Sequence, residues 1–239
     1  MRLFAALLAL ATAPAQADEA TEAFVEANLI SIFYHELGHA LIDVMALPVF
    51  GQEEDAADTA SILLIDAIFD NESAIDIAYD AALGFEREAL TTGDDITWSG
   101  VHGADMQRFY NLVCLFYGAD PDTRDDFAED MGLPADRAET CEEEFILAND
   151  SWGPVFDALY ENGGGATLFF TPAPDESLTA RVISAEIAEL NAQMRLPLDV
   201  AVTVESCGEA NAFYDPEARK ITICSEFETH LREISHEDG

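Results

Sequence analysis

Three titratable side chains, His35, Glu36 and His39, lie inside the apolar stretch FYHELGHALIDV, residues 33–44. They form the pattern H-E-x-x-H. Residues four apart on a helix share a face, so the imidazoles of His35 and His39 would point to one spot and could bind a single zinc ion. Glu36 would face the same side, where it could act as general base toward a zinc-activated water. The pattern is short and recurs by chance, so the prediction of a zinc hydrolase needs a third metal ligand.

The third ligand is predicted to come from the next helix. The longer pattern H-E-x-x-H-x-x-G-x-x-H is excluded, because the chain lacks the required glycine and third histidine. The alternative is a glutamate that stands four residues before an aspartate, and Glu54 and Asp58 have this spacing. Asp58 would accept the second ring N–H of a ligand histidine and fix its orientation. Glu53 is the competing ligand, but Ala57 follows it at the same spacing and offers no such partner.

Two predicted helices must position these residues. Apolar residues cover most of the circumference of a helix over residues 22–46, which predicts a deeply buried helix. Pro48 and Gly51 end this pattern, and a second helix is predicted from about residue 53 to residue 69. The connection is long enough to bring Glu54 back beside the histidines on an antiparallel helix.

The rest of the chain predicts an α+β fold in a single metallopeptidase domain, residues 18–239. A mostly helical body, about 18–162, would precede a small sheet with one helix, about 163–239. Residues 118–137 are rich in Asp and Pro and predict an acidic connection with short helices. Further helices are predicted at about 73–90, 104–116, 139–160 and 178–193, and strands at 166–171, 200–204 and 220–223.

The N-terminal segment MRLFAALLALATAPAQA, residues 1–17, predicts a secretory signal peptide. It has one early positive charge, an apolar run and the A-x-A ending Ala15-Gln16-Ala17. We therefore expect cleavage after Ala17 and a mature protein in the periplasm or outside the cell.

No later stretch is long and apolar enough for membrane insertion. The net charge of −38, from 10 basic and 48 acidic residues, disfavours nucleic acid and anionic lipid as partners.

The four cysteines are an even number in a chain predicted to be secreted, which favours two disulfides. Three pairings are possible. Cys207 and Cys224 flank a predicted hairpin, and Cys114 and Cys141 end two helical stretches. We expect disulfides 114–141 and 207–224.

A zinc hydrolase also needs a group that stabilises the oxyanion, usually His, Tyr or Arg. His102, which precedes a predicted helix, is the first candidate, and Tyr214 is another. Arg108 lies on that same helix, although a salt bridge is the more common role for an arginine in so acidic a protein. His230 and His236 lie near the acidic C-terminal end and are expected at the surface.

Three segments carry a resemblance to a known family. They are HELGHALIDVMALPVFGQEEDAAD (35–58), HGADMQRFYNLVCLFYG (102–118) and ESCGEANAFYDPEARKITIC (205–224). They resemble the bacterial metallopeptidase family DUF4344 over nearly all of the mature chain. The resemblance implies the fold of that family and, because the family is assigned by its H-E-x-x-H motif, a zinc peptidase.

A second, local resemblance concerns NAFYDPEARKITI, residues 211–223. It is similar to a segment of neprilysin-type zinc peptidases in which an edge strand binds the substrate backbone through an Asn side chain and an Ala carbonyl. This implies substrate-binding roles for Asn211 and Ala212, with Tyr214 close to the cleft. In neprilysin-type enzymes the segment precedes the zinc helix, whereas here it follows it. The alternative is an ordinary hairpin.

These observations predict a secreted metallopeptidase with one zinc ion per chain and a peptide or protein substrate. His35, His39 and Glu54 would bind the zinc, with Glu36 as general base. Two alternatives stay open: a zinc hydrolase of non-peptide amides or esters, and a secreted protein that binds zinc without catalysis.

Overall fold

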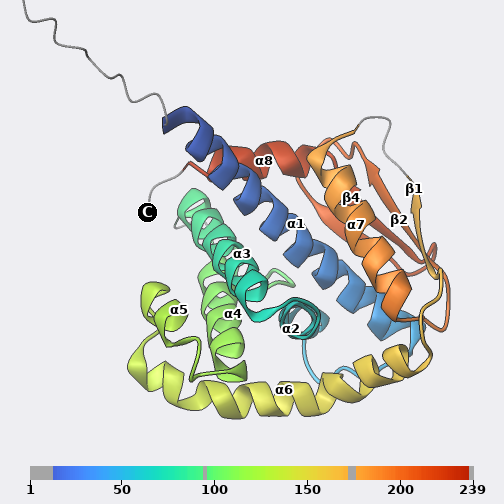
Figure 1. The fold of residues 1–239 in the computed structure, drawn as a ribbon, viewed down its shortest axis with the longest axis horizontal. Helices are drawn as coiled ribbons and strands as arrows, with labels where there is room; N and C mark the ends of the chain where they lie inside the picture. Colours follow the sequence, from blue (N-terminus) through green and yellow to red (C-terminus); the bar gives the residue numbers. More distant parts are fainter. Residues whose placement is uncertain (1–12, 94–95, 172–175, 237–239) are drawn as a thin grey trace, which may run out of the picture.

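The computed structural model describes residues 13–93, 96–171 and 176–236, which form the predicted α+β fold (Figure 1). Within these residues there are eight helices and one four-stranded sheet, which the C-terminal part of the chain forms. The helices are α1 (Ala13–Val44), α2 (Glu53–Ile68), α3 (Asn71–Thr92), α4 (Asp105–Ala119), α5 (Asp125–Asp130), α6 (Ala135–Glu161), α7 (Leu178–Gln193) and α8 (Glu226–Ile234). The strands are β1 (Leu168–Thr171), β2 (Val200–Glu205), β3 (Ala212–Asp215) and β4 (Lys220–Cys224).

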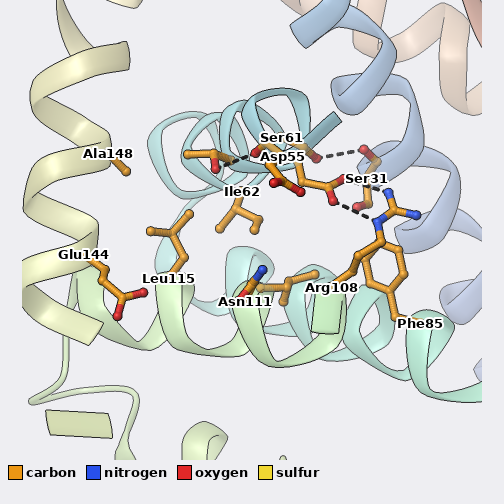
Figure 2. Close-up of a pocket in the computed structure, with 13 residues that line it drawn as sticks. Ser31, Asp55, Ser61, Ile62, Phe85, Arg108, Asn111, Leu115, Glu144 and Ala148 are labelled. Carbon is orange, nitrogen blue, oxygen red and sulfur yellow. Dashed lines mark hydrogen bonds and ion pairs between the residues drawn. The ribbon is translucent and has the colours of Figure 1, made fainter. Parts of the chain in front are cut away.

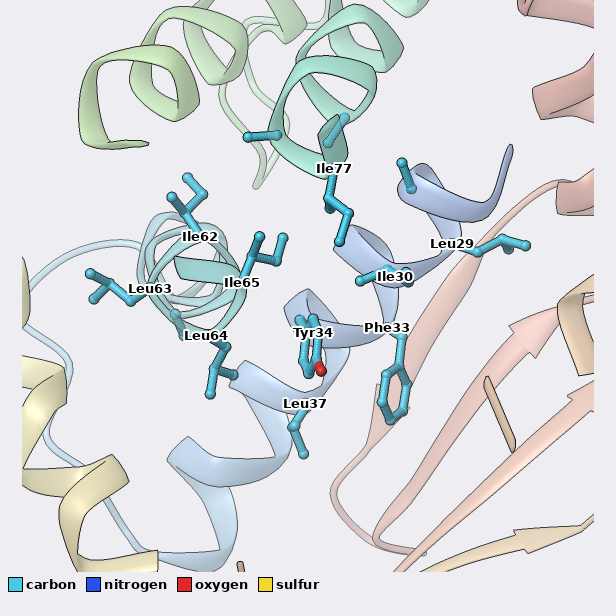
Figure 3. Packing of buried hydrophobic residues seen from close by; sticks show 14 of the residues in the cluster. Leu29, Ile30, Phe33, Tyr34, Leu37, Ile62, Leu63, Leu64, Ile65 and Ile77 are labelled. Atoms are coloured by element: carbon cyan, nitrogen blue, oxygen red, sulfur yellow. The ribbon is translucent and has the colours of Figure 1, made fainter. Parts of the chain in front are cut away.

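Helix α1 runs through the centre of the molecule, with α2, α3 and α4 on one side and α7 and the sheet on the other (Figure 1). Its side chains are apolar around most of the circumference, so it buries them against partners on all sides. Figure 3 shows Phe33, Tyr34 and Leu37 of α1 in the core beside Leu64 of α2 and Ile77 of α3. Because α1 is central, its polar residues lie between the helices α2 to α4 on one side and α7 with the sheet on the other.

The sheet has the strand order β1-β2-β4-β3, so β3 lies at one edge. The pairs β1–β2 and β2–β4 are parallel, and β3 pairs with β4 in the antiparallel sense as the predicted hairpin. Ala212 lies opposite Ile223 and Tyr214 opposite Ile221. Strand β3 also packs against α1, which brings residues 212–215 to the helix that carries the H-E-x-x-H motif.

Two elements differ from the prediction. Helix α1 begins at Ala13, before the predicted start at residue 22, so the expected cleavage after Ala17 falls inside it; residues 1–12 of the expected signal peptide lie outside the described residues. Helix α8 was not predicted, because its segment is short and acidic. Its apolar side chains nevertheless recur at helical spacing, and Leu231 and Ile234 are buried.

Both expected disulfides are present. One joins Cys114 in α4 to Cys141 in α6, and the other joins Cys207, which precedes β3, to Cys224 at the end of β4. Among the described helices, none combines the length and the apolar character that a membrane crossing requires.

Candidate metal centre

Helix α2 packs closely against α1 at Gly38. A Cβ atom at this position would lie 3.0 Å from the Cα atom and 3.2 Å from the carbonyl oxygen of Ala57. The missing side chain therefore lets the backbone of α2 approach α1. Ala57 lies one turn or less from Glu54 and Asp58, so this approach brings both carboxylates beside the histidines of α1.

Three potential ligand atoms converge between the two helices. His35 Nε2 and His39 Nε2 lie 3.3 Å and 3.2 Å from Glu54 Oε2, and 3.2 Å from each other. The three residues form a group whose ligand atoms all lie within 4.8 Å of one another. Two imidazoles and one carboxylate are a common ligand set of catalytic zinc sites.

The far nitrogen of each imidazole has a carboxylate partner. His35 Nδ1 lies 2.7 Å from Asp58 Oδ1, and His39 Nδ1 lies 2.8 Å from Glu53 Oε1. Each carboxylate accepts a hydrogen bond from an Nδ1–H group, and in that tautomer both Nε2 atoms present lone pairs to the same point. This donor set fits a divalent cation. The sequence predicted Asp58 as the partner of a ligand histidine. It predicted Glu53 only as a competing metal ligand, and not as the partner of His39.

Asp58 is itself held by Arg108 of α4. The guanidinium donates from Nε to Asp58 Oδ2 at 2.8 Å and from Nη2 to Oδ1 at 2.7 Å. The guanidinium also stacks 4.3 Å above the ring of Phe85 in α3 (Figure 2). Burial favours a higher pKa for Asp58, but Arg108 and then His35 outweigh it and hold the pKa well below its usual value. Arg108 thus forms a salt bridge, one of the two roles considered from the sequence.

His35 and Glu54 shift each other's pKa in opposite directions. Burial lowers the pKa of His35, but hydrogen bonds to Asp58 and Glu54 outweigh it and raise the pKa to about 9. The hydrogen bond from His35 in turn lowers the pKa of Glu54 to about 2. A metal ligand must be a neutral imidazole, so a cation would bind here in competition with a proton on His35.

Glu36 lies buried beside the two histidines, where burial raises the pKa of its carboxyl group against the opposing effect of His35 and His39. The backbone N–H of Tyr214 also faces this carboxylate. A raised pKa makes this carboxylate a better proton acceptor than an exposed glutamate.

Two cavities meet at this centre. One, which we call the large groove, has a volume of about 660 Å³ and contains His39, Glu54 and Tyr214 in its wall. The other, which we call the small pocket, has a volume of about 250 Å³ and contains Ile32 and Leu231. The residues that line both are His35, Glu36, His102, Asn211 and Ala212.

The other predicted site residues lie around these cavities. His102 Nε2 is 2.8 Å from Glu54 Oε2, and about half of the His102 side chain is exposed. Burial lowers the pKa of His102. The Tyr214 hydroxyl, the second candidate for oxyanion stabilisation, donates a hydrogen bond to Asp43 of α1 at 2.7 Å. His230, expected at the surface, instead is half-buried in an ion pair with Glu88 of α3.

The outer edge of β3 faces the two cavities. Cys224 N–H donates to the carbonyl oxygen of Asn211 at 2.9 Å, which makes this a hydrogen-bonded pair of the β3–β4 ladder. Hydrogen-bonded and non-hydrogen-bonded pairs alternate along an antiparallel ladder. The backbone N–H and C=O groups of Phe213 therefore point to β4, and those of Ala212 and Tyr214 point away from it. Ala212 N–H is bonded by its neighbour, the Asn211 side chain, at 2.9 Å.

The comparison with known proteins covers nearly the whole chain. Residues 2–155 and 176–239 match the family model of DUF4344, whose description is "Putative metallopeptidase". No curated protein and no solved structure matches the chain. A metallopeptidase family implies a bound metal, and the group of His35, His39 and Glu54 has the ligand chemistry to hold one. The chain belongs to the DUF4344 metallopeptidase family.

Proposed function

We propose that this chain is a secreted zinc peptidase that cleaves peptide bonds with Glu36 as its general base. One observation carries the proposal: a ligand atom from each of His35, His39 and Glu54 lies within 4.8 Å of the others, with the buried Glu36 carboxylate alongside. The domain would span residues 18–239, after removal of a signal peptide. The two disulfides fit export to the periplasm or beyond.

His35, His39 and Glu54 would hold the zinc ion. When bound, zinc acts as a Lewis acid on the substrate carbonyl and makes a water molecule more acidic. Asp58 and Glu53 would keep the two imidazoles in the tautomer that directs Nε2 at the metal, since each accepts from an Nδ1 atom. With only three protein ligands, the site would keep a position open for chemistry.

Glu36 would take a proton from the attacking water and return it to the leaving amine. Its burial supports this role, because the raised pKa makes the carboxylate a stronger base. His102 would donate a hydrogen bond to the oxyanion, since it lines both cavities and lies next to Glu54. Tyr214 is the alternative donor. Each of the two candidates has a carboxylate partner in this structure, Glu54 for His102 and Asp43 for Tyr214.

The substrate backbone would pair with the open edge of β3. The backbone groups of Ala212 and Tyr214 point away from β4, and an extended peptide could pair with their carbonyl oxygens and displace the Asn211 side chain from Ala212 N–H. Asn211 would bind the same backbone through its side chain, which is exposed and lines both cavities. Asn211→Ala should lower kcat/KM by on the order of 10–100-fold, the loss of one or two hydrogen bonds, without change in zinc content.

Three variants test the metal and the base. Purified wild type should hold about one zinc per chain, and Glu54→Ala should lose it. Glu53→Ala should still bind zinc, with affinity lowered by about 10–100-fold because His39 loses its orienting partner. Glu36→Gln should hold zinc but lose activity in a chelator-sensitive assay with casein or a peptide library.

The outcomes separate the candidate functions. Cleavage by wild type that is lost with a chelator and in Glu36→Gln supports the peptidase. Turnover of aryl esters or small amides alone would indicate a hydrolase of non-peptide substrates. If zinc-loaded wild type and Glu36→Gln are equally inert on all of these, the chain binds zinc without catalysis. Zinc that survives in Glu54→Ala but not in Glu53→Ala would move the third ligand to Glu53.

A further inference from the structure

We infer that the small pocket binds one large apolar side chain of the substrate, from a residue next to the bond that is cleaved. This inference rests on the proposed peptidase function and adds a substrate class to it. The candidate metal ligand His35, the proposed base Glu36 and the edge residue Ala212 all line the pocket. A side chain in this pocket therefore belongs to a substrate residue immediately beside the reacting carbonyl.

The pocket volume sets the size of what can enter. Its volume is about 250 Å³. Pockets that hold a whole drug-sized ligand measure roughly 300–1,000 Å³. The small pocket is therefore sized for one large side chain and not for several residues of a bound peptide. The large groove, at about 660 Å³, has room for the remainder of an extended chain.

Apolar side chains from three helices line part of the pocket. Ile32 lies one helical turn before Glu36 on α1, so it shares the face of the motif. Phe85 comes from α3, and Phe227 and Leu231 come from α8, where Leu231 is only 2 % exposed. A substrate side chain that entered here would exchange water for these apolar surfaces, which favours Phe, Leu or Met.

The charged groups of the wall disfavour an acidic side chain. Glu88 forms an ion pair with His230 of α8, and Arg108 is committed to Asp58 through two hydrogen bonds. Two further acidic residues line the wall, the proposed base Glu36 and Asp105 at the start of α4. A carboxylate from the substrate would meet Asp105 and Glu88 without a free cation to pair with.

Cleavage-site profiling tests the inference. The zinc-loaded mature protein is incubated with a library of peptides, and the cleaved bonds are identified by mass spectrometry. We expect one of the two positions beside the cleaved bond to be enriched in Phe, Leu and Met, by about 10–200-fold in kcat/KM over Gly. A flat profile at both positions, or a preference for Asp, Glu, Lys or Arg, would overturn the inference while leaving a chelator-sensitive peptidase intact.

Two variants change the pocket in opposite directions. Ile32→Phe should fill it and shift the preference at that position toward Ala and Gly, and Phe227→Ala should widen it and shift the preference toward Trp and Tyr. The matched control is Ile75→Phe, the same substitution at a half-buried position of α3 that lines neither cavity. Ile75→Phe should keep the wild-type profile, and an equal shift in it would mean that the effect is not local to the pocket.

A binding measurement applies even if no peptide is cleaved, in which case the proposed peptidase function fails by itself. Phenylalanine hydroxamate and glycine hydroxamate share the metal-binding group and differ in the side chain. By calorimetry, zinc-loaded wild type should bind the phenylalanine compound about 10-fold or more tightly, and Ile32→Phe should remove this difference. Equal affinities for wild type would overturn the inference.

Discussion

Asp58 connects the candidate metal centre to Arg108, and Asp58→Asn perturbs both contacts with little change in shape. The asparagine cannot serve as a charged acceptor for His35 Nδ1, which lies 2.7 Å from Asp58 Oδ1. Loss of such an orienting partner lowers metal affinity by about 10–100-fold. The guanidinium of Arg108 would also lose its two charged hydrogen bonds in a site where its side chain is 17 % exposed. Removal of one partner of a buried pair costs about 3–5 kcal/mol, so the metal-free protein should be destabilised by that order.

Arg108→Met separates the two effects. It removes the ion pair but leaves the Asp58 carboxylate to accept from His35, so zinc affinity should change much less than in Asp58→Asn. The loss of unfolding free energy in the double variant should be smaller than the sum of the two single losses, by about 0.5–3 kcal/mol. Each single variant leaves one charged group of the pair without its partner, whereas the double variant leaves none.

Two measurements are needed. Zinc affinity is measured by competition with a chromophoric chelator, and stability by urea unfolding with the zinc removed, because bound zinc adds stability by mass action. Asp58→Asn with wild-type zinc affinity would refute the orienting role of Asp58. Arg108→Met with the same loss of affinity as Asp58→Asn would show that the whole Asp58–Arg108 pair, and not the carboxylate alone, holds His35.

Three further predictions concern the scaffold. Gly38→Val should lower the melting temperature, at a cost of about 1–3 kcal/mol, and weaken zinc binding, because its Cβ would lie 3.0 Å from Ala57 Cα; an unchanged melting curve would contradict this. Replacement of Cys207 and Cys224 by serine should cost roughly 3 kcal/mol in urea unfolding, since the disulfide spans 17 residues, and unreduced peptide maps of wild type should recover that pair and no 114–207 link. Burial raises the pKa of Asp80 to about 6, so this carboxyl group favours folding fully only below its unfolded pKa near 4, and loses that contribution as the pH rises through about 6. Asp80→Asn should therefore be more stable than wild type at pH 8, by on the order of 1 kcal/mol after solvent screening, and not at pH 4; a gain of equal size at both pH values would contradict the assignment.

The sequence predicted those parts of the protein that local patterns encode. The all-round apolar pattern of α1 and the start of α2 near residue 53 follow from spacing and breakers along a short stretch. The ligand atoms of His35, His39 and Glu54 converge as the spacing suggested, because all three lie on two consecutive helices. The hairpin of β3 and β4 has the same local character.

The rest depends on contacts between distant segments. Arg108 and Asp58 are 50 residues apart and meet only because α4 packs under α2, which no spacing rule specifies. Tyr214 reaches Asp43 across 171 residues. Helix α8 was missed because acidic residues dominate its short sequence. Its few apolar side chains become recognisable as a buried face only when α8 is seen packed against α1 and α3.

Strand β3 is an open edge that is fixed at both ends. The disulfide Cys207–Cys224 ties the segment before it to the end of β4, and the turn at Asp215-Pro216 closes the other end, where the Asp215 side chain accepts from two backbone amides. A strand held in this way cannot slip along its neighbour, so its register is set by covalent and turn geometry. It is also only four residues long and is flanked by acidic residues and a proline. Short, charged edges are poor templates for β-sheet growth, so the chain can keep an edge exposed without inviting its own copies to aggregate on it.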